Sequence, residues 1–416
     1  MQDTNDGKSL ANSAQESPAE WVILLALCTG FTLSQAFRSV PAMMATKLQA
    51  DFLLTPKQLG VFAGTFHFSF AVMQLFMGIC IDIHGVRRTV LGAFPFVVAG
   101  SLLSALAPNF SVLILGQFFI GMGCSPAFLV CTVYISRHFA PKRFAAVSGI
   151  ALGIGGLGML ATGTPLAWLV QEYSWRNGFV ALGAGSVMAW LIMFSLANDC
   201  EVSLRPQHLE SVSMALRHLL TLFGQPQTVG IMALGAVTYA SYITLRGLWL
   251  GPLLIERFGY TLVQSGNVAL AVSALGMVGP AIFGKFDPKD HLRRRWIVFL
   301  TLAQAIFFVM LAWSTSATLT ISLIMIIGFL SGYMVFQYAD VRRAYPNALI
   351  GRAMAMFTMS MFMGVALMQW ITGISASMAK SFGVEPNIVV LCMIAVLLLV
   401  GALAFVVAPR PVVRAL

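Results

Sequence analysis

The sequence predicts an all-α membrane protein with twelve transmembrane helices arranged as two pseudo-symmetric six-helix bundles. Hydrophobic residues make up 58% and charged residues only 10% of the 416 positions, and the mean hydropathy is +0.85. Soluble domains carry about 25% charged residues, so most of this surface is not suited to water. Unbroken apolar runs of about twenty residues favour helices over a β-barrel, whose strands alternate over roughly ten residues.

Each apolar run is long enough to cross a hydrocarbon core of about 30 Å. The expected spans are 21–47, 58–80, 89–107, 111–136, 144–170, 177–197, 227–255, 261–284, 296–314, 318–339, 351–378 and 387–408. The longest polar stretch between spans separates the sixth from the seventh. The expected organisation is therefore a tail at 1–20, a bundle at 21–197, a linker at 198–226, a bundle at 227–408 and a tail at 409–416.

The distribution of basic residues predicts the orientation. Loops on the side of the two termini hold most of the 25 lysines and arginines. Cytoplasmic loops carry such an excess, so we expect both termini in the cytoplasm of a bacterium and the chain in its inner membrane. The opposite side holds only Lys47, Lys57, Arg176, Arg257 and Lys380.

Charged landmarks of the first half recur in the second half at a nearly constant spacing. Arg38 corresponds to Arg246, 208 positions later, and Asp82 and Arg137 correspond to Asp287 and Arg342, each 205 positions later. Internal duplication of this kind is typical of secondary transporters.

The segment GICIDIHGVRRTVL (78–91) resembles the loop signature of the major facilitator superfamily. Ile83 departs from that signature, because a basic residue is usual there, and GKFDPKDHLRRR (284–295) is a degenerate second copy. The resemblance covers the whole chain and implies two bundles that rock about a substrate site near the bilayer midplane. The positions that match are Gly78, Asp82, Gly85, Arg87 and Arg88.

Asp82 ends the second span, where the cytoplasmic faces of the two halves should meet. Its carboxylate could accept hydrogen bonds from a helix N-terminus and pair with Arg137, which ends the fourth span. Such contacts would hold a cytoplasmic gate shut. The alternative is a surface charge cluster that only sets the topology.

Arg38 and Arg246 lie inside the first and seventh apolar runs, where a guanidinium is costly. We find no carboxylate at that depth, which favours an external anion as the counter-charge; neutralisation by helix carbonyls is the alternative. Within the superfamily the pair resembles the arginines of organophosphate:phosphate antiporters, as does LRGLWLGPLL around Arg246. Two guanidinium groups facing one cavity would clamp an anion through paired hydrogen bonds.

The resemblance to those antiporters is incomplete. Gln74 stands where they carry a lysine in the second span, and the fifth span has no histidine. The lower positive charge favours a carboxylate or another less charged anion. Helical spacing places Ser34 and Gln35 on the face of Arg38, and Tyr239 and Tyr242 on the face of Arg246. These polar groups would shape a hydrated site or form interhelical hydrogen bonds.

His67 is the one histidine that we place within a span. It would carry a coupling proton, because histidine titrates near neutrality, or be a packed core residue.

We therefore expect a secondary active transporter of a small organic anion, a carboxylate or a phosphate ester, working by alternating access. Without a mid-membrane carboxylate to carry protons, anion exchange is more natural than proton symport. One alternative is a proton-coupled exporter of amphiphilic compounds, such as drugs or siderophores. Methionines at 354–368 favour it, as a cavity lining or as lipid-facing packing, and Gln117, where those exporters usually carry an arginine, opposes it.

The other alternative is a transport-inactive membrane sensor. We find no nucleophile–base set and no metal-ligand cluster in the sequence, so no enzymatic activity is expected. The expected protein is a monomer in a lipid bilayer, with no cofactor, metal ion or nucleic-acid partner.

Overall fold

The computed structural model is all-helical and describes residues 18–140, 143–197, 225–345 and 349–409. Eleven helices in these ranges are long and apolar enough to cross a membrane. The linker expected at 198–226 and the tails expected at 1–20 and 409–416 lie almost wholly outside the described residues.

The described part of the first half contains eight helices. They are α1 (Pro18–Phe37), α2 (Val40–Phe52), α3 (Pro56–Ala105), α4 (Phe110–Cys124), α5 (Ala127–His138), α6 (Phe144–Ala161), α7 (Thr164–Glu172) and, closing the half, α8 (Trp175–Leu196). Capping explains several of the boundaries. The Thr55 side chain accepts from the backbone of Gln58 while the Gln58 side chain accepts from the backbone of Thr55, which starts α3.

The expected spans 58–80 and 89–107 are joined in α3, which has 50 residues. At 1.5 Å per residue this is far more than one bilayer thickness. The helix is interrupted at Gly85, whose φ of +79° is left-handed and suits a residue without a Cβ. The arms on either side of Gly85 lie next to each other, because Met77 and Ala93 line the same pocket. The two arms are the second and third spans.

The second half is built in the same way. It contains α10 (Pro226–Thr244), the π-helical turn η2 (Leu245–Trp249), α11 (Leu250–Phe258), α12 (Leu262–Lys285), α13 (Asp290–Ala312), α14 (Ala317–Leu330), the 3₁₀ turn η3 (Ser331–Tyr333), α15 (Met334–Ala344), α16 (Ile350–Ser381) and α17 (Pro386–Val407).

Irregular backbone recurs at corresponding places in the two halves. The first span breaks at 38–39, between α1 and α2, and the seventh has its π turn at 245–249. The fourth span breaks at 125–126 and the tenth at 331–333. These spacings match those of the charged landmarks, so the repeat extends to the backbone.

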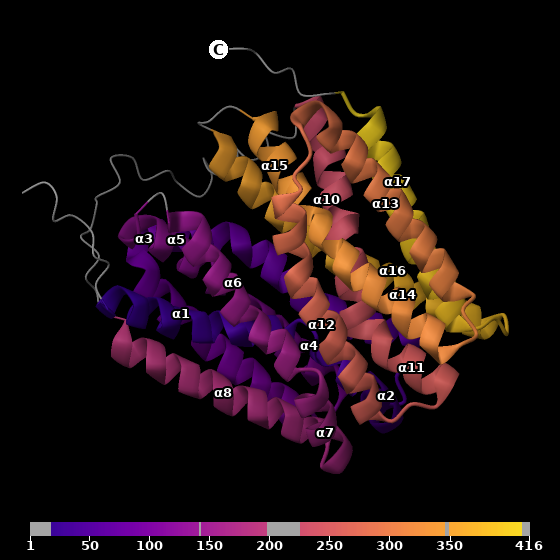
Figure 1. Cartoon of the computed structure of the whole chain (residues 1–416). Helices are drawn as coiled ribbons and strands as arrows, with labels where there is room; N and C mark the ends of the chain where they lie inside the picture. The colour runs from indigo at the N-terminus through magenta and orange to yellow at the C-terminus, as the bar shows by residue number, and fades with distance from the viewer. Residues whose placement is uncertain (1–17, 141–142, 198–224, 346–348, 410–416) are drawn as a thin grey trace, which may run out of the picture.

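The two halves meet at one end of the molecule, which we call the Asp51 end. There α2 contacts η2 and α11, the first arm of α3 contacts α16, and α7 contacts α12. Figure 1 shows the halves converging around α2, α7 and α11 and diverging toward α3, α5 and α15. We call this contact surface between the halves the seam. Across it, Lys57 N donates to Ser377 Oγ (2.9 Å) and Thr164 Oγ1 donates to Asn267 Oδ1 (2.6 Å).

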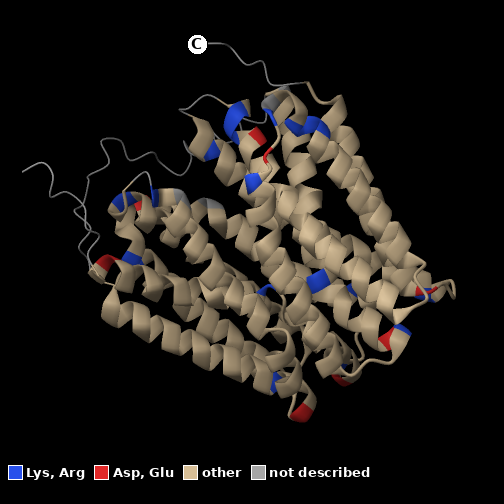
Figure 2. Cartoon of the chain, in the orientation of Figure 1, with Lys and Arg blue, Asp and Glu red and all other residues tan. Residues whose placement is uncertain are grey.

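The opposite end carries the turn at Gly85, and we call it the Gly85 end. Glycines of the seam helices have open space here, since a Cβ would meet nothing within 4 Å. Figure 2 shows most of the blue basic residues at this end and long uncharged stretches of helix between the ends. The open positions are Gly78, Gly149, Gly153, Gly284 and Gly351.

Candidate functional site

Arg38 lies at the break between α1 and α2 and is only 5% exposed. Its guanidinium carbon lies 4.9 Å from the ring centre of Phe70 and 4.6 Å from that of Phe362. Nη1 donates to the hydroxyl of Tyr239 at 3.4 Å. Nε is buried and finds no hydrogen-bond partner among the described residues. Arg38 thus reaches from the first half to α10 and α16 of the second.

Arg246 is the second residue of the π turn and is 1% exposed. Its Nε donates to Ser273 Oγ (2.8 Å) and to the carbonyl of Ala269 (3.1 Å), both in α12. Nη2 donates to the carbonyl of Met159 in α6, at 3.0 Å. Nη1 is buried without a partner in the described part of the chain. Arg246 therefore reaches from the second half to the first, the reverse of Arg38.

The backbones that carry the two arginines touch. A Cβ at Gly247 would lie 3.1 Å from the carbonyl oxygen of Arg38. No carboxylate lies within salt-bridge distance of either arginine in the ranges that the structure describes. Each guanidinium is held by neutral groups and keeps at least one buried nitrogen without a hydrogen-bond partner among the described residues.

The polar companions expected from helical spacing divide into two groups. Ser34 donates to the carbonyl of Cys124 (3.3 Å), and the Tyr242 hydroxyl donates to the carbonyl of Val272 (3.4 Å), so both make interhelical hydrogen bonds.

Tyr239 contacts Arg38 directly. Gln35 and Gln74 each bury an Oε1 atom that finds no partner among the described residues. Tyr239 is therefore the companion that contacts Arg38, and Gln35 and Gln74 each keep an unused hydrogen-bond acceptor.

His67 is fully buried in the first arm of α3. Its Nδ1 lies 3.3 Å from the carbonyl oxygen of Ala63, and its ring is stacked with that of Phe362. Nε2 is without a partner in the described structure. The histidine shares Phe362 with Arg38 and so belongs to the same cluster.

Phe70, Phe362 and Met159 contact the arginines but were not singled out from the sequence. Phe70 lies one turn after His67, which is a weak signal among 31 phenylalanines. Met159 contributes only its backbone carbonyl, for which side-chain chemistry offers no signal.

The loop residues expected to form a gate are only partly brought together. Arg137 lies 3.9 Å from Asp82, and the Asp82 side chain is 71% exposed. Arg87 donates to the carbonyl of Phe194 at 3.2 Å. Arg88 is exposed, and Gly78 has open space around it. In this conformation these residues lie where the two halves are apart.

The second copy of the loop pairs its charges differently. Asp287 receives two hydrogen bonds from Arg293, at 2.6 and 2.9 Å, whereas Arg342 is exposed. Asp340 accepts from Arg294 at 3.2 Å inside the second half. The correspondence of Asp82–Arg137 with Asp287–Arg342 therefore does not extend to the contacts.

The methionines of α16 do not form a lipid-facing stripe. Met356, Met361 and Met368 are buried within the protein, and Met359 and Met363 are half-buried. Lipid-facing packing is therefore the wrong interpretation for the buried members. Met356 and Met361 pack in a core cluster of the second half, and Met368 packs in the core cluster that includes residues of both halves. No cluster of side chains that could hold a metal ion occurs among the described residues.

Comparison with known proteins identifies the family. The model of the Major Facilitator Superfamily matches residues 26–368. The chain belongs to the Major Facilitator Superfamily. This superfamily member is a secondary transporter, and the family consists of transporters rather than enzymes.

Solved structures agree with the superfamily fold. A bacterial homologue of the human lysosomal transporter Spinster, described as inward-facing and occupied, has a TM-score of 0.74 at 16% identity, with 94% of this chain and 97% of that chain covered. The D-xylose–proton symporter has a TM-score of 0.74 at 14% identity, with coverages of 95% and 99%. The first protein in its inward-facing, unoccupied form has a TM-score of 0.71 at 16% identity, with coverages of 94% and 95%. At these identities the likeness shows the fold alone.

Proposed function

We propose that this transporter carries a small organic anion, a carboxylate or a phosphate ester, bound by Arg38 and Arg246. The observation that carries the proposal is that both guanidinium groups are buried without a carboxylate partner in the described chain. Each also keeps an unpartnered nitrogen, Nε in Arg38 and Nη1 in Arg246. An intramembrane charge is expensive without a counter-charge, and a bound anion supplies one.

The neutral groups around the arginines compensate only part of that cost. Carbonyl oxygens and ring faces offer partial negative charge, and a cation–π contact contributes about 0.5–2 kcal/mol. They also hold each guanidinium in a fixed plane, which suits two-point binding of a carboxylate or phosphate. Gln35, Gln74 and Tyr239 add neutral hydrogen-bonding groups, so the site favours a singly or doubly charged anion over a polyanion.

The proposed orientation places the Gly85 end and both termini in the cytoplasm, because most basic residues lie there. The membrane would be the bacterial inner membrane. The closed seam at the Asp51 end then makes this conformation inward-facing. The two bundles are 21–197 and 227–408, joined by a linker at 198–226. After the halves close, the cytoplasmic gate is formed by Gly78, Asp82, Gly85, Arg87, Arg88 and Arg137.

Thermal unfolding of the purified protein tests the proposal. Wild type, Arg38→Gln, Arg246→Gln and the control Arg295→Gln, an exposed arginine at the Gly85 end, are heated with phosphate esters, mono- and dicarboxylates or amphiphilic cations. A ligand at ten times its Kd stabilises by about 1.4 kcal/mol. We expect one class of anion to raise the Tm of wild type and the control, and neither site variant to respond.

Arg246→Lys tests whether the positive charge alone is enough to bind the anion. Lysine keeps the charge but cannot reproduce the three hydrogen bonds that the Arg246 guanidinium donates. If anions act equally on all variants, the arginines are structural.

Stabilisation by amphiphilic cations would then favour the second candidate, a proton-coupled exporter. The buried methionines of α16 support that candidate, since thioethers form adaptable apolar surface.

A further inference from the structure

The first half contains a pocket of about 350 Å³ between the two arms of α3 and α4. Its wall is apolar along most of its length, formed by the thioethers of Met73, Met77 and Met122 with Ala93 and Phe96. Phe96 is 42% exposed and stacks on Phe119, so this wall reaches the outer surface of the bundle. The pocket is separate from Arg38 and Arg246 and from the seam.

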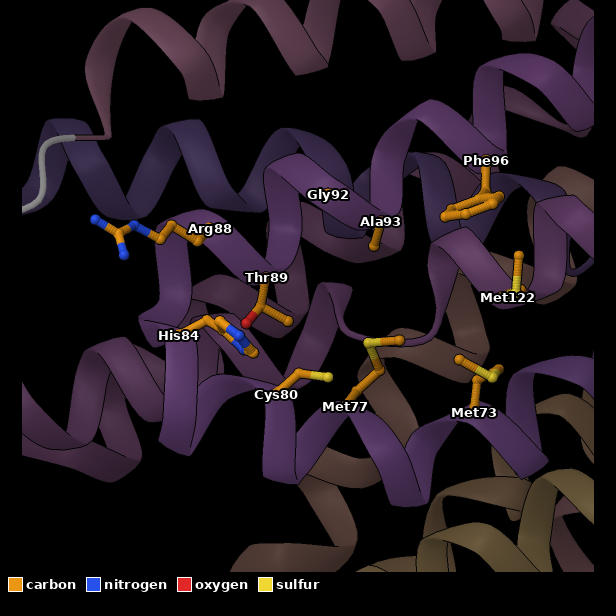
Figure 3. A pocket seen from close by; sticks show the side chains of 10 residues that line it. All are labelled: Met73, Met77, Cys80, His84, Arg88, Thr89, Gly92, Ala93, Phe96 and Met122. Carbon is orange, nitrogen blue, oxygen red and sulfur yellow. The ribbon is translucent and has the colours of Figure 1, made fainter. Parts of the chain in front are cut away.

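Polar groups occur at one end of the pocket. Figure 3 shows Arg88 and His84 at that end and Met73, Met122 and Phe96 at the other. The hydroxyl of Thr89, between them, already donates to the carbonyl of Gly85 at 2.7 Å. No lining residue has a buried polar atom without a partner in the described structure. The interior therefore has nothing to recognise a polar ligand, and recognition by charge is confined to the rim.

Arg88 supplies that charge. It is exposed and has no carboxylate partner among the residues described. It follows the Gly85 turn, at the end of the molecule where basic residues gather. A long apolar pocket that opens on a lipid-facing surface and ends at a cation matches one acyl chain and the phosphate of a membrane lipid.

We propose that this pocket binds an anionic phospholipid, with one acyl chain along Met73, Met77, Ala93 and Phe96 and the phosphate at Arg88. Binding depends on the apolar wall and the guanidinium together. The proposal is independent of the transported substrate, because none of these residues contacts either buried arginine. A lipid held here bridges the two arms on either side of Gly85 and so braces the loop that carries Asp82.

Two substitutions test the two parts of the site. Arg88→Gln removes the cation from an exposed side chain. Gly92→Leu fills the pocket, because Gly92 lines it and a Cβ there meets nothing within 4 Å. The matched controls lie in the second half: Arg295→Gln, an exposed arginine at the same end, and Gly284→Leu, another glycine in open space.

The measurement is thermal unfolding in detergent with added phosphatidylglycerol or phosphatidylcholine, together with native mass spectrometry to count bound lipid. We expect phosphatidylglycerol to raise the Tm of wild type and both controls more than phosphatidylcholine does. Arg88→Gln and Gly92→Leu should lose at least half of that difference and retain one fewer phosphatidylglycerol.

Equal stabilisation of all five proteins would overturn the proposal, because the lipid would then act as a general annulus. Equal effects of the two lipids on wild type would also overturn it, since the site would not select a negative charge. A loss in the controls as large as in the site variants would place the lipid elsewhere.

Discussion

Gly247 packs against the carbonyl oxygen of Arg38, so the segments that carry the two buried arginines are in backbone contact. One turn further along, a Cβ at Gly251 would overlap the carbonyl oxygen of Ala42, whereas at Gly247 it would lie 3.1 Å from its neighbour. The closed seam between the first and seventh spans therefore depends on these two glycines to different degrees.

Gly251→Ala is expected to open the Asp51 end. An overlap with backbone costs about 1–3 kcal/mol, which changes a two-state equilibrium by about 5- to 150-fold. Spin labels at Leu53 and Phe382, exposed residues of that end, would report a longer distance by pulsed electron resonance after the six native cysteines are replaced. Gly247→Ala is the matched control and should change the distances little. An unchanged distribution in folded Gly251→Ala protein would contradict this account of the seam.

Phe362→Leu is expected to weaken binding of the transported anion. The substitution keeps an apolar side chain but removes the ring face 4.6 Å from the Arg38 guanidinium. Loss of about 0.5–2 kcal/mol corresponds to a rise in KM of about 2- to 30-fold. Uptake into proteoliposomes over a range of substrate concentrations measures it. Phe179→Leu is the control, because Phe179 is also buried but packs on Trp175 in α8. Equal KM values for both variants would remove any special role for Phe362.

Asp340→Asn is expected to destabilise the folded protein by about 1–3 kcal/mol, because Arg294 would lose a charged hydrogen-bond partner in a largely buried setting. Asp82→Asn should change stability by less than about 1 kcal/mol, since its contact with Arg137 is long and exposed. Thermal unfolding of the two variants in one detergent compares them. A larger loss for Asp82→Asn would show that its contacts matter more than their distances indicate.

Asp82→Asn is nevertheless expected to slow transport if the loop closes the cytoplasmic gate. The substitution should then lower kcat, while the rise in Tm that the substrate produces in the resting protein stays unchanged. The discriminating measurement is the rate of counterflow against the ligand-dependent Tm shift. A normal rate would leave the charge cluster with a topological role only.

His67→Gln tests proton coupling. The ring is fully buried and stacks with Phe362, the same ring that lies 4.6 Å from the Arg38 guanidinium carbon. This packing is typical of a core residue. We expect substrate uptake by the variant to keep the pH dependence of wild type. Internal pH, followed with a fluorescent dye during uptake, provides the check. Loss of substrate-driven proton movement only in His67→Gln would assign the coupling proton to this histidine.

The sequence predicted the spans and the buried arginines because each rests on a local signal. A charge within an apolar run is conspicuous, and apolar runs of sufficient length identify helices. The breaks at 38–39 and 245–249 were not predicted, because spans that are apolar on every side have no periodicity that an interruption could disturb. The pairing of Asp287 with Arg293 rather than Arg342 depends on helix packing at the Gly85 end, which spacing along the chain does not encode.

The aromatic surroundings of Arg38 illustrate the same limit. Phe70 and Phe362 are almost 300 positions apart and meet only because α3 and α16 pack together across the seam. Tyr239 was predicted as a site residue because it lies two turns before Arg246 on one helix face. The guanidinium that it contacts, however, is that of Arg38. Spacing identified the right face of the helix but could not assign its partner across the interface.

The glycines of the seam helices have one further consequence. At the Asp51 end, Gly60 and Gly251 are pressed against backbone carbonyls of the opposite half, while on the same helices or their partners Gly78 and Gly351 face empty space at the other end. In the proposed alternating-access cycle the two ends close in turn, so both contact surfaces must allow helices to approach closely. We therefore expect side chains added at Gly78 and Gly351 to be tolerated in this conformation and to hinder closure of the Gly85 end, so that a stability test of one resting state would misjudge these positions.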